Sequence, residues 1–221
     1  MRRALNSILT SKWTKVVVFL LCLVPLGVLI WRGFQGDLTA NPIEFVEHWT
    51  GDWTIRFLII TLCITPLRKL LHVPLLIRFR RMLGLFAFFY VCLHFSAWVV
   101  LDHFFNLHEM WADVLKRRYI TVGFTGFVLL LPLAITSTAG WIRRLGGKRW
   151  QLLHRAIYFA AIAGVIHYYW LVKSDERKPL QYAAIVGILL ALRIGFWIYT
   201  RQQRSSAHNL PSEEPSTAET A

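Results

Sequence analysis

Six apolar segments of about twenty residues constrain this chain more than any other feature of its sequence. They cover residues 16–34, 53–71, 82–101, 120–137, 150–170 and 180–199. A run of about 20 apolar residues is long enough to cross the hydrocarbon core of a bilayer as a helix. In lipid, a helix also satisfies its backbone polar groups within the segment. The sequence therefore predicts an all-α membrane protein, a bundle of six transmembrane helices.

The distribution of Lys and Arg predicts the orientation of this bundle. Fifteen of these residues flank the segments on the side that holds both termini, and six lie on the other side. Basic residues favour the cytoplasmic side, so we expect both termini there. We expect a cytoplasmic N-terminus over residues 1–15, a membrane domain over residues 16–200 and a disordered cytoplasmic tail over residues 201–221. The basic residues that set this orientation also account for the net charge of +13. The charge therefore does not indicate nucleic-acid binding, and we expect membrane lipid and no nucleic acid as partner.

Three of the eight histidines fall inside the apolar segments. His94 lies in residues 82–101, while His154 and His167 lie near opposite ends of residues 150–170. Imidazoles within a membrane helix are costly and suggest function, although each can also simply hydrogen-bond a neighbouring helix. The remaining five histidines lie outside the segments or at their edges, where a solvated or interfacial role is expected. They are His48, His72, His103, His108 and His208.

The separation of His154 and His167 favours haem over zinc or copper. Thirteen residues of helix place the two rings about 20 Å apart, whereas a structural metal site gathers its ligands within a few ångström. Haem needs only two axial ligands for each iron. The rise per residue of a helix gives the depth of each histidine from the cytoplasmic face of the membrane. This depth is about 20 Å for His94, about 27 Å for His167 and about 7 Å for His154. We therefore expect His94 and His167 to ligate an outer haem iron, with His154 left at an inner site.

Two further residues belong to this haem hypothesis. Arg80 lies fourteen residues before His94, on nearly the same helix face. We expect it to bind a haem propionate or to act as a charge partner. His154 and His167 lie about 140° apart around a straight helix, so a shared face requires a bend. Gly164 is the candidate for that bend.

Four short runs resemble the MsrQ family. They are residues 74–85 leading to His94, residues 136–138, residues 147–154 and residues 166–168. The similarity covers roughly residues 10–200. It implies a ferric reductase-like transmembrane domain, the haem-binding membrane subunit of the bacterial MsrPQ methionine sulfoxide reductase system. It also implies that His94, His154 and His167 are haem-site residues.

The resemblance implies an electron-transfer subunit of an oxidoreductase system rather than its catalytic subunit. Its implied cofactors are b-type haem, one or two per chain, and FMN, for which no residue identifies a site. Electrons would come from a cytoplasmic flavin reductase or the quinone pool. They would pass through the inner membrane to the periplasmic, molybdopterin-containing MsrP, which repairs oxidised methionine in envelope proteins. We expect the outer loops, including the basic residues 116–118, to contact that partner.

Two other function classes stay open at this point. A self-sufficient ferric or quinone reductase would use the same histidines without a protein partner. A cofactor-free membrane scaffold or transporter would use them as contacts between helices. A reduced-minus-oxidised optical spectrum separates the scaffold or transporter from both redox functions.

Overall fold

The computed structural model describes residues 9–172 and 175–208, which are helical almost throughout and contain no strand. Six of its helices are long. They are α2 (Lys12–Gln35), α3 (Pro42–Leu70), α4 (Ile77–Ala97), α6 (Arg118–Ile135), α9 (Ala156–Leu171) and α10 (Arg177–His208). Five shorter helices connect them. They are η1 (Pro74–Leu76), η2 (Trp98–Asp102), α5 (Leu107–Lys116), α7 (Ala139–Leu145) and α8 (Gly147–Leu153).

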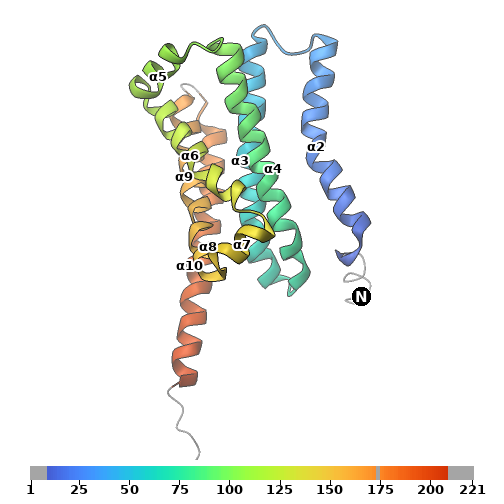
Figure 1. The fold of residues 1–221 in the computed structure, drawn as a ribbon, viewed down its shortest axis with the longest axis vertical. Coiled ribbons are helices and arrows are strands. Elements are labelled where there is room, and N and C mark those ends of the chain that lie inside the picture. Colours follow the sequence, from blue (N-terminus) through green and yellow to red (C-terminus); the bar gives the residue numbers. More distant parts are fainter. Residues whose placement is uncertain (1–8, 173–174, 209–221) are drawn as a thin grey trace, which may run out of the picture.

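The long helices run alternately in opposite directions, so that α2 begins and α10 finishes at the same end of the bundle (Figure 1). The hairpin of α3 and α4 forms the centre, and α6 packs along α9 beside it. Helix α10 contacts both α9 and α3, whereas α2 stands at the opposite side of the hairpin. The end where α3 begins and α4 finishes is called the upper end below, as it is drawn in Figure 1.

Four helical stretches among the described residues are long and apolar enough to cross a membrane. They are Lys12–Gln35, Pro74–Asp102, Arg118–Ile135 and Arg177–Gln203. The other two long helices are less apolar or shorter, since α3 carries Asp52 and Arg56 and α9 has 16 residues. Four such stretches make the chain a multi-pass membrane protein.

Several helix boundaries differ from those that hydropathy predicts. Helix α3 begins at Pro42 rather than near residue 53, because Asn41 caps it by accepting a hydrogen bond from the Glu44 amide at 3.3 Å. A capping residue followed by proline is a helix start signal that an apolar count ignores. Helix α10 continues to His208 instead of ending near residue 199. The predicted disordered tail otherwise lies outside the described residues. The predicted loops also contain helices, namely η1, α5, α7 and the first three residues of α8.

Helix α2 is joined to the hairpin through an inserted side chain. The hydroxyl of Tyr90 donates to the Cys22 carbonyl at 2.9 Å and accepts from the Leu26 amide at 3.2 Å. It thus bridges these two groups, which lie four residues apart in α2 next to Pro25. The indole of Trp49 donates to the Pro25 carbonyl at 3.0 Å. Proline and an inserted side chain are two known causes of helix kinks, so this contact fixes the course of α2.

The helix that carries two of the candidate histidines is interrupted at the first of them. Helix α8 finishes at Leu153 and α9 begins at Ala156, with His154 and Arg155 forming a turn between them. The Arg155 amide bonds the Leu152 carbonyl at 3.1 Å, three residues back. By contrast, α9 continues without interruption through Gly164, where a bend was expected. His154 and His167 therefore do not belong to one continuous helix.

Candidate functional site

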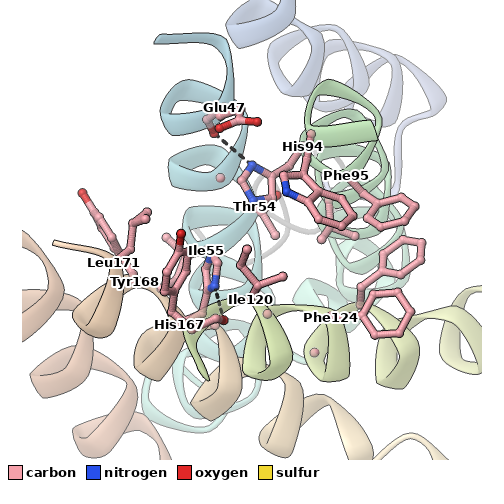
Figure 2. Close-up of a pocket in the computed structure, with 18 of the residues that line it drawn as sticks. Glu47, Thr54, Ile55, His94, Phe95, Ile120, Phe124, His167, Tyr168 and Leu171 are labelled. Carbon is pink, nitrogen blue, oxygen red and sulfur yellow. Dashed lines mark hydrogen bonds between the residues drawn. The ribbon is translucent and has the colours of Figure 1, made fainter. Parts of the chain in front are cut away.

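A cavity lies between α3, α4, α6 and α9 in the upper half of the bundle (Figure 2). Its volume is about 200 Å³, and it is partly open to solvent.

The polarity of the wall changes along the cavity. Its upper end carries charged and polar side chains, and its lower end is apolar. The polar residues are Glu47, His48, Asp52, Asp102, Arg117, Tyr119 and Tyr168, and the apolar ones include Leu58, Val91, Phe127, Leu130 and Ala160. Such a wall suits a ligand with an apolar body and a charged end that faces the membrane surface.

His94 of α4 and His167 of α9 meet across this cavity, with ring centroids 6.0 Å apart (Figure 2). The Nδ1 atom of His94 lies 3.0 Å from the Glu47 carbonyl oxygen, and Nδ1 of His167 lies 2.7 Å from the Tyr119 carbonyl oxygen. A carbonyl oxygen only accepts, so each Nδ1 must carry the proton and each Nε2 keeps its lone pair. No hydrogen bond to either Nε2 is seen among the described residues. Both imidazoles are thus prepared to bind a metal through Nε2.

Each ring also packs against a glycine one helical turn after the carbonyl that holds it. A Cβ atom at Gly123 of α6 would lie 2.5 Å from Nδ1 of His167, and a Cβ at Gly51 of α3 would lie 3.3 Å from Nδ1 of His94. The arrangement occurs twice, with Tyr119 preceding Gly123 and Glu47 preceding Gly51 by four residues. Sequence reasoning missed both glycines, because an isolated glycine in a helical pattern has many explanations. The structure shows the reason, which is close approach of a histidine ring.

The spacing of the two rings can be tested against a shared metal. A metal–imidazole bond is about 2.0 Å long, which puts the ring centres of two imidazoles on opposite sides of one metal about 6 Å apart. The observed 6.0 Å agrees with this value. Two imidazoles at this spacing, beside a largely apolar cavity with a polar end, would be able to hold the iron of a haem. The residues present therefore fit a haem.

Asp113 of α5 organises the polar end of the cavity. Its carboxylate lies 3.2 Å from Nε2 of His103 and 3.2 Å from Nε of Arg117. Arg117 also donates to the Tyr119 hydroxyl at 3.3 Å, and this bond raises the pKa of the Arg117 guanidinium. Of the solvated or interfacial role expected for His103, the solvated one is wrong, since this ring is buried. Helix α5 folds back onto the bundle, and this places the Asp113 carboxylate beside His103.

The third candidate, His154, is not brought near a second histidine. Its Nε2 lies 3.1 Å from the Thr136 hydroxyl, and its ring stacks on Trp150 at 3.9 Å between centroids. The Thr136 hydroxyl donates its own proton to the Pro132 carbonyl at 2.6 Å. His154 must therefore donate through Nε2, so in this conformation that nitrogen has no free lone pair.

Arg80 lies in the lower half of α4 and does not line the cavity. It is close enough to His154 for the two charges to interact. The guanidinium that lines the polar end is that of Arg117. If a haem bound between His94 and His167, Arg117 would be placed to bind its propionate, the role that was expected of Arg80.

Comparisons with known proteins point to one family. Residues 50–165 match the family described as ferric reductase like transmembrane component. Among curated relatives, the protein-methionine-sulfoxide reductase heme-binding subunit MsrQ of Herminiimonas arsenicoxydans is 52% identical over 195 residues, or 87% of this chain and 89% of the relative. The MsrQ of Caulobacter vibrioides is 48% identical over 80% and 85% of the two chains. That of Rhodospirillum rubrum is 51% identical over 81% and 86%. No solved structure matches the chain.

Proposed function

Because this chain belongs to the MsrQ family, the heme-binding subunits of protein-methionine-sulfoxide reductase, we propose that it conducts electrons across the bacterial inner membrane to a periplasmic, molybdopterin-containing MsrP. The observation that carries the proposal is the pair His94 and His167, two imidazoles 6.0 Å apart with both Nε2 atoms free. A membrane scaffold or transporter that lacks a cofactor has no need of this arrangement.

In this proposal His94 and His167 would hold the iron of a b-type haem, and the haem would supply one-electron transfer. The carbonyls of Glu47 and Tyr119 fix the tautomer and the orientation of the two rings. Arg117 receives a carboxylate of the bound group at the polar end. The apolar lower wall excludes water and disfavours charge around the site.

We further propose six membrane spans with both termini in the cytoplasm. The alternating course of the six long helices supports this number (Figure 1). The distribution of charge supports the orientation, because all acidic residues in the described ranges lie in the upper half of the bundle or above it. They are Asp37, Glu44, Glu47, Asp52, Asp102, Glu109, Asp113, Asp175 and Glu176. The lower loops carry a series of Lys and Arg residues, as a cytoplasmic surface does.

With that orientation the cavity lies on the periplasmic side, near the proposed partner. The electron source is proposed to be a cytoplasmic flavin reductase or the quinone pool, with FMN as a further cofactor by family resemblance. His154, with Arg80 beside it, is the proposed site of an inner haem. The described residues provide one imidazole there, and Thr136 would have to release it.

The test is the haem content of variants in lipid nanodiscs. His94→Ala and His167→Ala should lose the same haem, with equal haem-to-protein ratios and matching residual spectra. His154→Ala should leave that haem in place. If His94→Ala instead matched His154→Ala while His167→Ala kept its haem, the proposed pair would be refuted. Reoxidation by purified MsrP, compared with a ferric chelate and with a quinone, separates the conduit from a self-sufficient reductase.

A further inference from the structure

Helix α5 exposes an apolar stripe beside its exposed polar residues His108, Glu109 and Lys116. Leu107, Trp111 and Leu115 follow at intervals of four residues and are 74%, 62% and 68% exposed. Residues four apart lie on one helix face, so these three form a stripe. The carboxylate of Asp113 is turned toward the protein, where it contacts His103.

Two phenylalanines extend this stripe into the turn before α5. Phe104 and Phe105 are 77% and 66% exposed. Both also have positive φ angles, 46° and 63°. A left-handed backbone is unfavourable for bulky residues and persists only where other interactions compensate. Two backbone hydrogen bonds hold the turn, from the Phe105 amide to the Val99 carbonyl at 3.0 Å and from the Asn106 amide to the His103 carbonyl at 2.8 Å. In water it would nevertheless expose two large rings.

We infer that α5 and the preceding turn form a membrane anchor. The anchor lies in the lipid interface at the end of the bundle that holds the cavity. Its anchor stripe, buried among lipid acyl chains, consists of Phe104, Phe105, Leu107, Trp111 and Leu115. The anchor would lie at the membrane surface at this end of the bundle, whichever side of the membrane that end faces.

The position of α5 in the chain supports this inference. It follows the membrane-spanning stretch Pro74–Asp102 and leads directly into Arg118–Ile135, so both of its ends are at one membrane surface (Figure 1). Ten residues of helix measure about 15 Å, half the thickness of the hydrocarbon core, and cannot cross it. An amphipathic helix of this kind lies in the plane of the interface, where tryptophan is favoured.

A lipid surface fits the anchor stripe better than a soluble protein does. A protein partner that binds and leaves would expose five large apolar side chains to water between encounters, whereas lipid always covers them.

The anchor has a consequence for the cavity. Asp113, on the opposite face of α5 from the stripe, contacts Arg117 in the cavity wall and His103 beneath it. Lipid contact of the stripe therefore holds α5 where it presents this carboxylate to both groups.

Spin labelling tests the anchor directly. In a variant with Cys22, Cys63 and Cys92 replaced by serine, a single label is placed in nanodiscs at Trp111→Cys or, as the control on the polar face of the same helix, at Glu109→Cys. The label at residue 111 should collide several-fold more often with oxygen, which concentrates in lipid, than with a water-soluble nickel chelate. The label at residue 109 should show the reverse. Equal access of the chelate to both positions would overturn the anchor, as would protection of residue 111 that arises only when MsrP is added.

A second measurement leaves the native cysteines in place. The fluorescence of Trp111 is the difference between the spectra of the unmodified protein and the Trp111→Phe variant. Lipids with brominated acyl chains should quench this difference, and iodide in the aqueous phase should not. Quenching by iodide alone would refute lipid contact. Neither readout depends on haem or electron transfer, so a failure of the anchor and a failure of the proposed function are distinguishable.

Discussion

Replacing Gly123 with alanine should weaken haem binding, although the mutation touches no ligand atom. The new Cβ would lie 2.5 Å from Nδ1 and 2.9 Å from Cε1 of His167. Non-bonded heavy atoms prefer about 3.5–4.0 Å, so the ring must move by roughly 1 Å. That movement would lengthen the 2.7 Å contact with the Tyr119 carbonyl beyond the usual limit of a hydrogen bond. Losing such an orienting partner typically costs about 10- to 100-fold in metal affinity.

Helix propensity favours alanine over glycine, so the Gly123→Ala substitution should stabilise α6 while it weakens haem binding. A loss of haem affinity could then not be attributed to unfolding of α6. Alanine is about 1 kcal/mol more favourable than glycine within a helix, so Gly123→Ala should not unfold α6. Gly51→Ala provides a graded comparison, because its Cβ would lie 3.3 Å from the His94 ring. Gly187→Ala in α10 is the neutral control, with no atom within 4 Å of the added Cβ.

The assay is titration of haem into the three variants in nanodiscs, followed by the optical spectrum of the bound form. Affinity should fall most for Gly123→Ala, less for Gly51→Ala and not at all for Gly187→Ala. Equal affinity of the Gly123→Ala and Gly187→Ala variants would refute the steric argument. A larger loss for Gly51→Ala than for Gly123→Ala would show that a different contact decides the position of the rings.

Three further predictions follow from other parts of the fold. A reporter that is active only in the periplasm should stay silent when it is fused after His208, and an active fusion would invert the proposed topology. Charge reversal of Lys116 and Arg118 to glutamate should slow salt-dependent reoxidation by MsrP at unchanged haem content, and stopped-flow rates equal to those of the unmodified protein would remove these residues from the docking surface. Tyr90→Phe removes two hydrogen bonds to α2 and should lower the free energy of unfolding by about 1–3 kcal/mol. The melting temperature in detergent should fall accordingly. An unchanged melting temperature would mean that the Leu26 amide bonds the Cys22 carbonyl directly in the variant.

Hydropathy and histidine placement predicted much of the architecture and the pair at its centre. Four of the predicted segments correspond to stretches apolar enough to cross a membrane. Depth along straight helices placed His94 nearest His167, and the structure brings these rings to 6.0 Å. The count for His167 crosses the break at His154, but α9 itself is uninterrupted from Ala156 to Leu171 and has a constant rise per residue. Haem ligation by this pair stays a prediction until it is measured.

Features that depend on contacts between distant segments were not predictable in the same way. The burial of His103 requires the return of α5, which places Asp113 beside it. The role of Gly123 requires His167, which lies 44 positions later in the chain. The break at His154 has no proline or glycine in the turn itself to announce it. Periodicity reports which face of a helix is apolar, but it does not report which partner that face meets.

The two long helices that hydropathy describes least well are both walls of the cavity. Helix α3 carries Asp52 and Arg56, and α9, which bears His167, has 16 residues and follows the break at His154. A helix that faces lipid on all sides must be apolar throughout, whereas one enclosed by neighbours can carry charge where a partner is present. In α3, Arg56 lies 3.3 Å from Asp52 and donates to the Tyr182 hydroxyl of α10 at 3.0 Å. Two of the four helices that line the cavity therefore fall short of a simple membrane-crossing stretch, α3 because it carries charge and α9 because it is short.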